Sequence, residues 1–174
     1  MYTQPGLWRS LCRFGPSNNP ALKEARVQPG GIRFRIQPPT FAIPPHDANY
    51  VAPPMDITFL KDIELVRLRP HAHIRGKSAR YTVTYPDGRE EIVLNVPGYD
   101  FNWQLSYATA LKLPKGSRMR FEFRYDNSVG NKNNPDPNRW VYQGFQSWEE
   151  MMAPNLGFLV DRDADIGGLI SITD

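Results

Sequence analysis

Polar and apolar residues alternate with a period of two along most of the recognisable segments of this chain. The clearest case is residues 117–126, where Met119, Phe121, Phe123 and Tyr125 are separated by charged residues. Successive side chains of a β-strand point to opposite faces, so this pattern predicts a strand with one buried apolar face. A helical period of 3.6 dominates nowhere, which favours an all-β fold.

The same period, together with short apolar runs, predicts the other strands. They are residues 31–36, 57–69 (one long strand or two short ones), 79–85, 91–96, 140–145 and 156–160. A hairpin turn is expected at Pro86-Asp87-Gly88-Arg89, where proline and glycine suit the turn positions. The proline-rich residues 38–54 read as an irregular crossing segment, and residues 127–138 as a structured loop. Many short antiparallel strands predict an all-β, antiparallel β-sandwich or jelly roll with little helix.

Length and composition limit the number of domains that the chain can form. With 174 residues, 40% of them hydrophobic, the chain can form one domain with a full core. Residues 1–36 hold six basic residues against Glu24 alone, interrupted by prolines. We therefore expect residues 1–30 to be poorly ordered and residues 31–174 to form the sandwich. A net charge of +3 does not indicate a nucleic-acid partner, and no apolar stretch reaches the length of a membrane span or a signal peptide.

Two of the three histidines are His71 and His73, at positions i and i+2. On an extended strand both rings project from one face, roughly 6.5 to 7 Å apart along the chain, close enough to share one metal ion. A pair of neutral imidazoles suits copper, zinc, iron or nickel, and the third ligand decides among these metals. The alternative is two surface histidines on a polar strand face.

The third ligand has few candidates. A cupin-type site would need a glutamate three or four residues after His73, but Gly76 and Lys77 stand there, and no further histidine follows. The segment of residues 146–152 then stands out, because the soft thioethers of Met151 and Met152 could complete a site with two imidazoles and one thioether. A thioether favours Cu(I) over zinc or magnesium, which would make this a copper site. Plain core packing of both methionines is the alternative interpretation.

Seven short motifs, in order along residues 43–152, carry a resemblance to a known family. They are His71-Ala72-His73-Ile74-Arg75-Gly76-Lys77, Tyr85-Pro86-Asp87-Gly88, Tyr99-Asp100-Phe101-Asn102-Trp103-Gln104, Leu113-Pro114-Lys115-Gly116, Tyr125-Asp126-Asn127-Ser128, Asn134-Pro135-Asp136-Pro137 and Gln146-Ser147-Trp148-Glu149-Glu150-Met151-Met152. The chain resembles the copper type II, ascorbate-dependent monooxygenases, above all their bacterial members. Peptidylglycine α-hydroxylating monooxygenase and dopamine β-monooxygenase are more distant relatives. The resemblance covers only the second, C-terminal, of the family's two copper-bearing sandwiches.

The resemblance implies a site and an activity. Its copper ligands would be His71, His73 and Met151, and this copper would bind O2 and serve in the hydroxylation of a substrate C–H bond, with ascorbate as reductant. Arg69 matches a family position that holds a substrate carboxylate, although a solvated strand-end charge explains it equally well. Ala153 and Asn155 depart from the other substrate positions, so a small-molecule or peptide-like substrate is expected, but not a peptidylglycine. The resemblance also implies a periplasmic or secreted full-length protein.

The resemblance is incomplete in one respect. The family's other sandwich holds a second copper on three histidines, whereas this chain offers only His46, which reads as a loop residue. We therefore expect a partner, a second copper-bearing β-sandwich domain, and favour the view that this chain is a fragment of a longer one. Two alternatives remain: a copper-binding module without turnover, and a structural or carbohydrate-binding sandwich in which both histidines are incidental.

Overall fold

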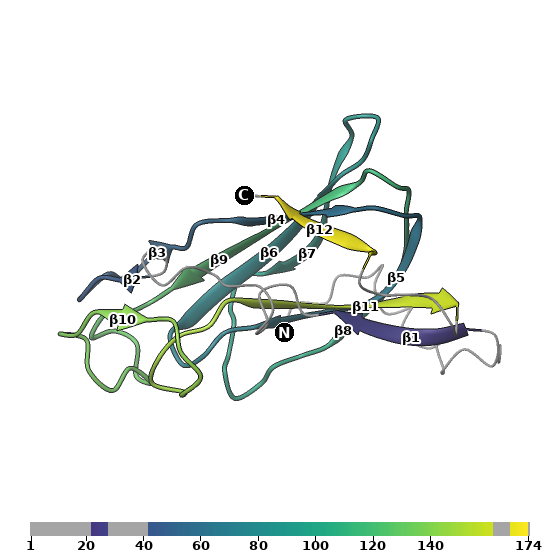
Figure 1. Cartoon of the computed structure of the whole chain (residues 1–174). Coiled ribbons are helices and arrows are strands. Elements are labelled where there is room, and N and C mark those ends of the chain that lie inside the picture. The colour runs from purple at the N-terminus through teal and green to yellow at the C-terminus, as the bar shows by residue number, and fades with distance from the viewer. Residues whose placement is uncertain (1–21, 28–41, 162–167, 174) are drawn as a thin grey trace.

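The computed structural model describes residues 22–27, 42–161 and 168–173 of the chain (Figure 1). This described part contains strands, turns and loops but no helix. Two antiparallel sheets pack face to face as a sandwich, and the hydrophobic core lies between them (Figure 1). The predicted fold class, an all-β antiparallel sandwich, is thereby confirmed. None of the described residues belongs to a helix with the length and hydropathy needed to cross a membrane.

The strands divide between two main sheets and one short ladder. The first sheet has the order β1 (Leu22–Val27), β11 (Ala153–Asp161), β5 (Ile63–His71) and β8 (Tyr107–Leu113). The second has the order β12 (Ile170–Thr173), β4 (Met55–Phe59), β9 (Arg118–Tyr125), β6 (Gly76–Thr84) and β7 (Glu90–Val96), with β3 (Tyr50–Val51) also paired to β9. The short ladder joins β10 (Val141–Tyr142) to β2 (Ala42–Ile43).

Strand β9 forms the apolar centre of the second sheet, as its alternation predicts. Met119, Phe121, Phe123 and Tyr125 are fully buried, whereas the arginines between them are exposed. The ring of Phe121 meets that of Tyr81 edge to face, with centroids 4.7 Å apart. Burial of large aromatic side chains supplies much of the stabilising apolar area in such a core.

The structure refines one predicted segment and contains the predicted hairpin. Residues 57–69 are two strands in different sheets, β4 and β5, so the chain crosses the sandwich between them. The hairpin between β6 and β7 is present: the Tyr85 N–H donates to the Arg89 carbonyl at 2.8 Å, and Gly88 has φ of 86°. A positive φ is the reason that glycine suits this turn.

Five strands were not predicted: β1, β2, β3, β8 and β12. The short strands β2 and β3 lie within residues 38–54, which were expected to be irregular. Strand β8 reads Tyr-Ala-Thr-Ala-Leu-Lys-Leu, and its small residues blur the apolar pattern. Strand β1 pairs with β11 although it falls inside residues 1–30. The predicted strand at 31–36 and the one cysteine of the sequence, Cys12, to which no role was given, lie outside the described residues. The domain boundary at residue 30 stays a prediction.

A bulge in β5 sets the face on which the two histidines lie. The register with β8 shifts between Leu65 and Arg67, and both Leu65 and Leu68 are buried in the core. Such a shift moves every later side chain to the other face. After the bulge Pro70 turns inward, so His71 faces away from the core.

Candidate metal centre

The rings of His71 and His73 lie beside each other on the outer face of the first sheet. Their centroids are 5.2 Å apart and their planes meet at 79°. His71 ends β5 and is half-buried, whereas His73 is only 5% exposed. Ala72, between them, points into the core. The two imidazoles are therefore close enough to meet one ion between them.

The tautomer of His71 follows from its neighbour Gln104. The Gln104 Nε2 donates to the carbonyl of Phe101 at 3.0 Å, which turns its Oε1 towards the ring. The His71 Nδ1 lies 2.7 Å from that oxygen. Because an amide oxygen only accepts, Nδ1 carries the proton, and in the neutral form of the ring Nε2 keeps a free lone pair.

His73 reaches the same state by a different contact. Its Nδ1 lies 3.2 Å from the backbone carbonyl of Glu149, which again can only accept a hydrogen bond. Burial lowers the pKa of His73, so the ring stays neutral at pH 7. Both rings thus present an Nε2 lone pair, which is the arrangement in which metal-binding histidines are held by an outer hydrogen bond through Nδ1.

Met151 and Met152 lie on opposite faces of the first sheet. Strand β11 pairs with β5 in the register Ala153 to His71, and continuing that register sets Met151 opposite His73. Residues opposite each other in an antiparallel pair share a face. Met152 then lies opposite Ala72, in agreement with its 3% exposure and its place in the core. Met151 is half-buried, and the continued register would place it on the face that carries the two histidines.

A buried carboxylate, Glu150, joins the two ligand-bearing segments. Its Oε2 accepts the N–H of His73 at 2.8 Å and that of Met151 at 3.2 Å, and its Oε1 accepts the N–H of Arg75 at 2.6 Å. Glu150 is fully buried. Burial raises its pKa to about 7, although the three backbone donors act in the opposite direction. One side chain therefore fixes the backbone at both candidate ligand segments.

Arg75 extends this network behind the site and is itself only 2% exposed. Its Nε donates to Asn127 Oδ1 at 2.9 Å, and a terminal nitrogen donates to the Trp148 carbonyl at 2.8 Å. Asn127 in turn donates to the carbonyls of Pro44 and Arg139. The guanidinium thus ties residues 148–150 to the loop that follows β9.

Tyr99 holds the residue between the two histidines. Its hydroxyl accepts the Ala72 N–H at 3.0 Å and donates to the Ala72 carbonyl at 2.7 Å. Burial raises the pKa of Tyr99 to about 12, so the hydroxyl keeps its proton. A Cβ on Gly76 would lie 2.7 Å from the Tyr99 ring and 2.8 Å from the Ala72 Cβ. Only glycine leaves room for this contact.

The remaining predicted site residues lie as follows. Arg69 is exposed on β5, two residues before His71 and on the same face, opposite Asn155. His46 occupies a turn with φ of 61°, and its N–H donates to the Pro137 carbonyl. Among the described residues no three His, Cys, Asp or Glu side chains gather as metal ligands. A metal ion at the histidine pair would therefore need a ligand of another type, such as a thioether.

Three residues that position the candidate ligands were not predicted to do so: Gln104, Glu150 and Tyr99. Their functions depend on contacts across 33, 77 and 27 residues of chain, which no local spacing reveals. For Glu150 the sequence offered one signal: this acidic residue stands directly before two methionines, of which Met152 is buried in the core. A charged side chain so close to the core needs hydrogen-bonding partners, because burial of an unpaired charge is costly.

Comparison with known proteins adds little to this picture. No protein-family model matches the chain, and no curated protein matches its sequence. Structures of infectious bursal disease virus from the Gt and Gx strains are similar at 11% and 10% sequence identity, each with a TM-score of 0.34. These matches cover 86% and 87% of this chain but only 35% of each viral chain. Similarity at this level supports no argument about function.

Proposed function

We propose that this chain is a copper-binding β-sandwich domain in which His71, His73 and Met151 hold one copper ion. We further propose that it is the oxygen-binding half of an ascorbate-dependent monooxygenase that hydroxylates a C–H bond. One observation carries the proposal: the two adjacent imidazoles are both fixed in the tautomer that leaves Nε2 free.

The donor set fits copper better than its competitors. Two neutral imidazoles and one thioether are softer ligands than zinc or magnesium prefer, and they favour Cu(I). The carboxylate of Glu150 is occupied by three backbone N–H groups, so it does not offer a hard oxygen ligand in their place. Bound copper would supply one-electron chemistry with O2, with ascorbate as the source of electrons.

The protein itself would contribute rigidity and partial exclusion of water. Gln104 and the Glu149 carbonyl orient the two rings, and Glu150 and Tyr99 fix the backbone that carries them. The Phe101 ring meets the His73 ring edge to face, with centroids 6.1 Å apart, and covers one side of the pair. Such outer contacts commonly change metal affinity by about 10- to 100-fold.

Substrate and partner follow from the same proposal. Arg69 lies on the histidine face and is free to meet an anionic group of a small-molecule or peptide-like substrate. Because the described residues contain no second histidine cluster, the complete enzyme would need a second copper-bearing sandwich to deliver electrons. Such an enzyme would act in the periplasm or outside the cell.

The experiment that tests the metal site is a copper titration of the purified chain, with His46→Ala as the matched control. Wild type and His46→Ala should each bind one Cu(I) per chain. His71→Ala and His73→Ala should each bind at least about 100-fold more weakly, because one of three ligands is gone. Equal copper affinity in all four proteins would contradict the proposed site.

A copper-binding module without turnover is the second candidate, and activity separates it from the first. With ascorbate and O2, the isolated copper-loaded chain should release peroxide slowly and hydroxylate poorly, since it lacks the second copper domain. Addition of that domain should couple O2 consumption to product. Tight coupling in the isolated chain would contradict the half-enzyme hypothesis, and no reaction with O2 in either case would favour the module.

A further inference from the structure

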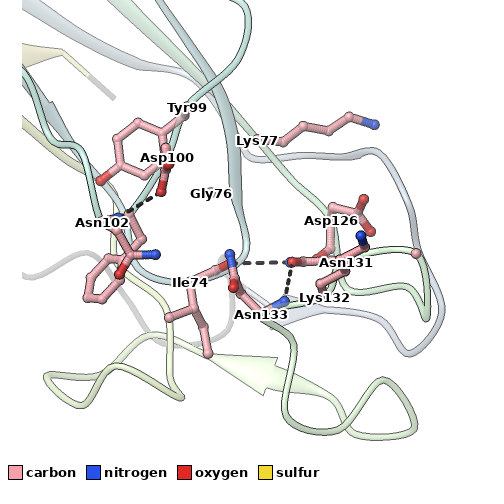
Figure 2. A pocket seen from close by; sticks show the side chains of 12 residues that line it. Ile74, Gly76, Lys77, Tyr99, Asp100, Asn102, Asp126, Asn131, Lys132 and Asn133 are labelled. Carbon is pink, nitrogen blue, oxygen red and sulfur yellow. Dashed lines mark hydrogen bonds between the residues drawn. The ribbon is translucent and has the colours of Figure 1, made fainter.

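A polar pocket of about 540 Å³ opens beside the metal centre, between the loop after β7 and the loop after β9. Figure 2 shows Tyr99, Asp100 and Asn102 on one wall and Asp126 with residues 131–133 on the other, with Gly76 between them. Phe101 also lines the pocket. Since its ring contacts that of His73, the pocket and the histidine pair are neighbours.

Internal hydrogen bonds hold the wall after β9 in place. Asp126 Oδ1 accepts the Ser128 N–H at 2.9 Å and its hydroxyl at 2.6 Å. Asn131 Nδ2 donates to the carbonyls of Asp126 and Ile74, and its Oδ1 accepts the Asn133 N–H at 3.0 Å. A wall fixed in this way loses little freedom when a ligand binds.

Several polar groups of the pocket are left over after this internal bonding. Asp100 Oδ1 accepts the Asn102 N–H at 2.8 Å, but its second oxygen makes no hydrogen bond within the described part of the chain. The same holds, within that part, for the side chains of Asn102, Lys132 and Asn133 and for the second oxygen of Asp126. The pocket therefore offers acceptors and donors side by side.

The charges of the pocket select for a neutral ligand. Lys77 and Lys132 contribute two positive charges, and Asp100 and Asp126 contribute two negative ones. An anion would meet two carboxylates, and a metal cation would meet two ammonium groups. A hydroxyl group donates and accepts at once, so it can pair with a carboxylate, an amide or an ammonium alike. The volume falls in the usual range for small-ligand sites.

From these observations we propose that this pocket is a binding site for a neutral polyhydroxylated molecule of the sugar class. The free groups of Asp100, Asn102, Lys132 and Asn133 bind its hydroxyl groups, and the Tyr99 and Phe101 rings give an apolar surface for its C–H groups. The site requires no metal ion. Where the proposed copper function also holds, the sugar is bound next to the copper.

The test is an NMR titration of the 15N-labelled full chain in EDTA with cellobiose, lactose and N,N′-diacetylchitobiose. At least one disaccharide should shift backbone amides that cluster at residues 99–102 and 130–133. The double variant Asn102→Ala/Asn133→Ala should bind that sugar at least about tenfold more weakly, because two hydrogen bonds are lost. Asn95→Ala, an exposed position on β7, should bind as wild type.

Neither substituted amide side chain bonds to the rest of the described chain, so the fold should persist, and the spectrum reports this directly. The proposal is overturned if no disaccharide shifts these amides, if the double variant binds equally well, or if only inorganic phosphate, or calcium chloride added in buffer without EDTA, shifts them. Since EDTA removes copper, sugar binding and copper binding are scored separately, and either proposal can fail alone.

Discussion

The end of the sandwich that carries the histidine pair buries a different kind of side chain from the rest of the core. Five polar or charged residues are buried in the described part of the chain: His73, Arg75, Ser117, Asn127 and Glu150. All but Ser117 belong to the network around the candidate metal centre. The body of the core is otherwise aliphatic and aromatic.

This contrast shows what each region is built to do. Apolar burial stabilises the sandwich without demanding one geometry, and it tolerates substitutions of similar volume. Burial of Arg75 and Glu150 is costly unless each polar atom finds a partner, so this region is fixed only when its hydrogen bonds are complete. Such a network gains little net stability but holds two distant segments at a defined separation.

The largest expected effect is on the polar region. Glu150→Ala removes the acceptor for three backbone N–H groups and a buried carboxyl group that favours the charged form of Arg75. We expect the free energy of unfolding, measured by urea denaturation, to fall by about 3–5 kcal/mol. The neighbouring Glu149→Ala should cost less than about 1 kcal/mol, because that side chain bonds only the exposed Gln146 N–H. Equal losses of unfolding free energy in Glu150→Ala and Glu149→Ala would contradict the structural role given to the buried carboxyl group.

The same substitution, tyrosine to phenylalanine, can be made in both regions, at Tyr99 beside the candidate metal centre and at Tyr81 in the core. Tyr99→Phe leaves the N–H and carbonyl of Ala72 unpaired and should cost about 1–3 kcal/mol of unfolding free energy. Tyr81→Phe removes a buried hydroxyl that has no hydrogen-bond partner among the described residues, so the variant should be as stable as wild type or slightly more stable. Thermal and urea unfolding of both variants measure the difference. A larger loss of unfolding free energy in Tyr81→Phe than in Tyr99→Phe would contradict the view that hydrogen bonds fix the structure around the candidate metal centre and not the rest of the core.

The smallest effect concerns a charge pair at the surface, in contrast to the buried Glu150. Arg120 donates to both oxygens of Asp56 and holds the pKa of this carboxyl below its ordinary value of 3.8. The stabilisation is present above about pH 4 and is lost as the pH falls through the lower pKa of the folded state. Asp56→Asn should cost less than about 1 kcal/mol at pH 7, and this cost should shrink as the pH falls below about 4. A stability difference from wild type that does not shrink on acidification would contradict this ion pair.

The fold was largely accessible from sequence because it rests on local periodicity. The alternation in β9 and the turn chemistry at Gly88 act over a few residues and appear directly in the sequence. Strand β8 was not predicted, because its small side chains give no clear alternation of polar and apolar residues. The crossing between β4 and β5 depends on which sheet each strand joins, which is a property of tertiary packing.

The candidate site divides along the same line. The i and i+2 spacing predicts that His71 and His73 share a face, and strand alternation separates Met151 from Met152. The orientation of the rings could not be predicted, because it depends on Gln104 and the Glu149 carbonyl, both distant in sequence. Residue spacing predicts which side chains share a face of a strand, whereas contacts between residues distant in sequence determine the tautomers and hydrogen-bond partners of those side chains.

The central claim, copper held by His71, His73 and Met151, is tested most directly by X-ray absorption of the Cu(I)-loaded chain with two matched variants. Wild type should show nitrogen scatterers and one sulfur scatterer at copper. Met151→Leu should lose the sulfur signal, and Met152→Leu, a change of similar volume in the core, should keep it. A sulfur signal that survives Met151→Leu, or that disappears in Met152→Leu, would contradict the account.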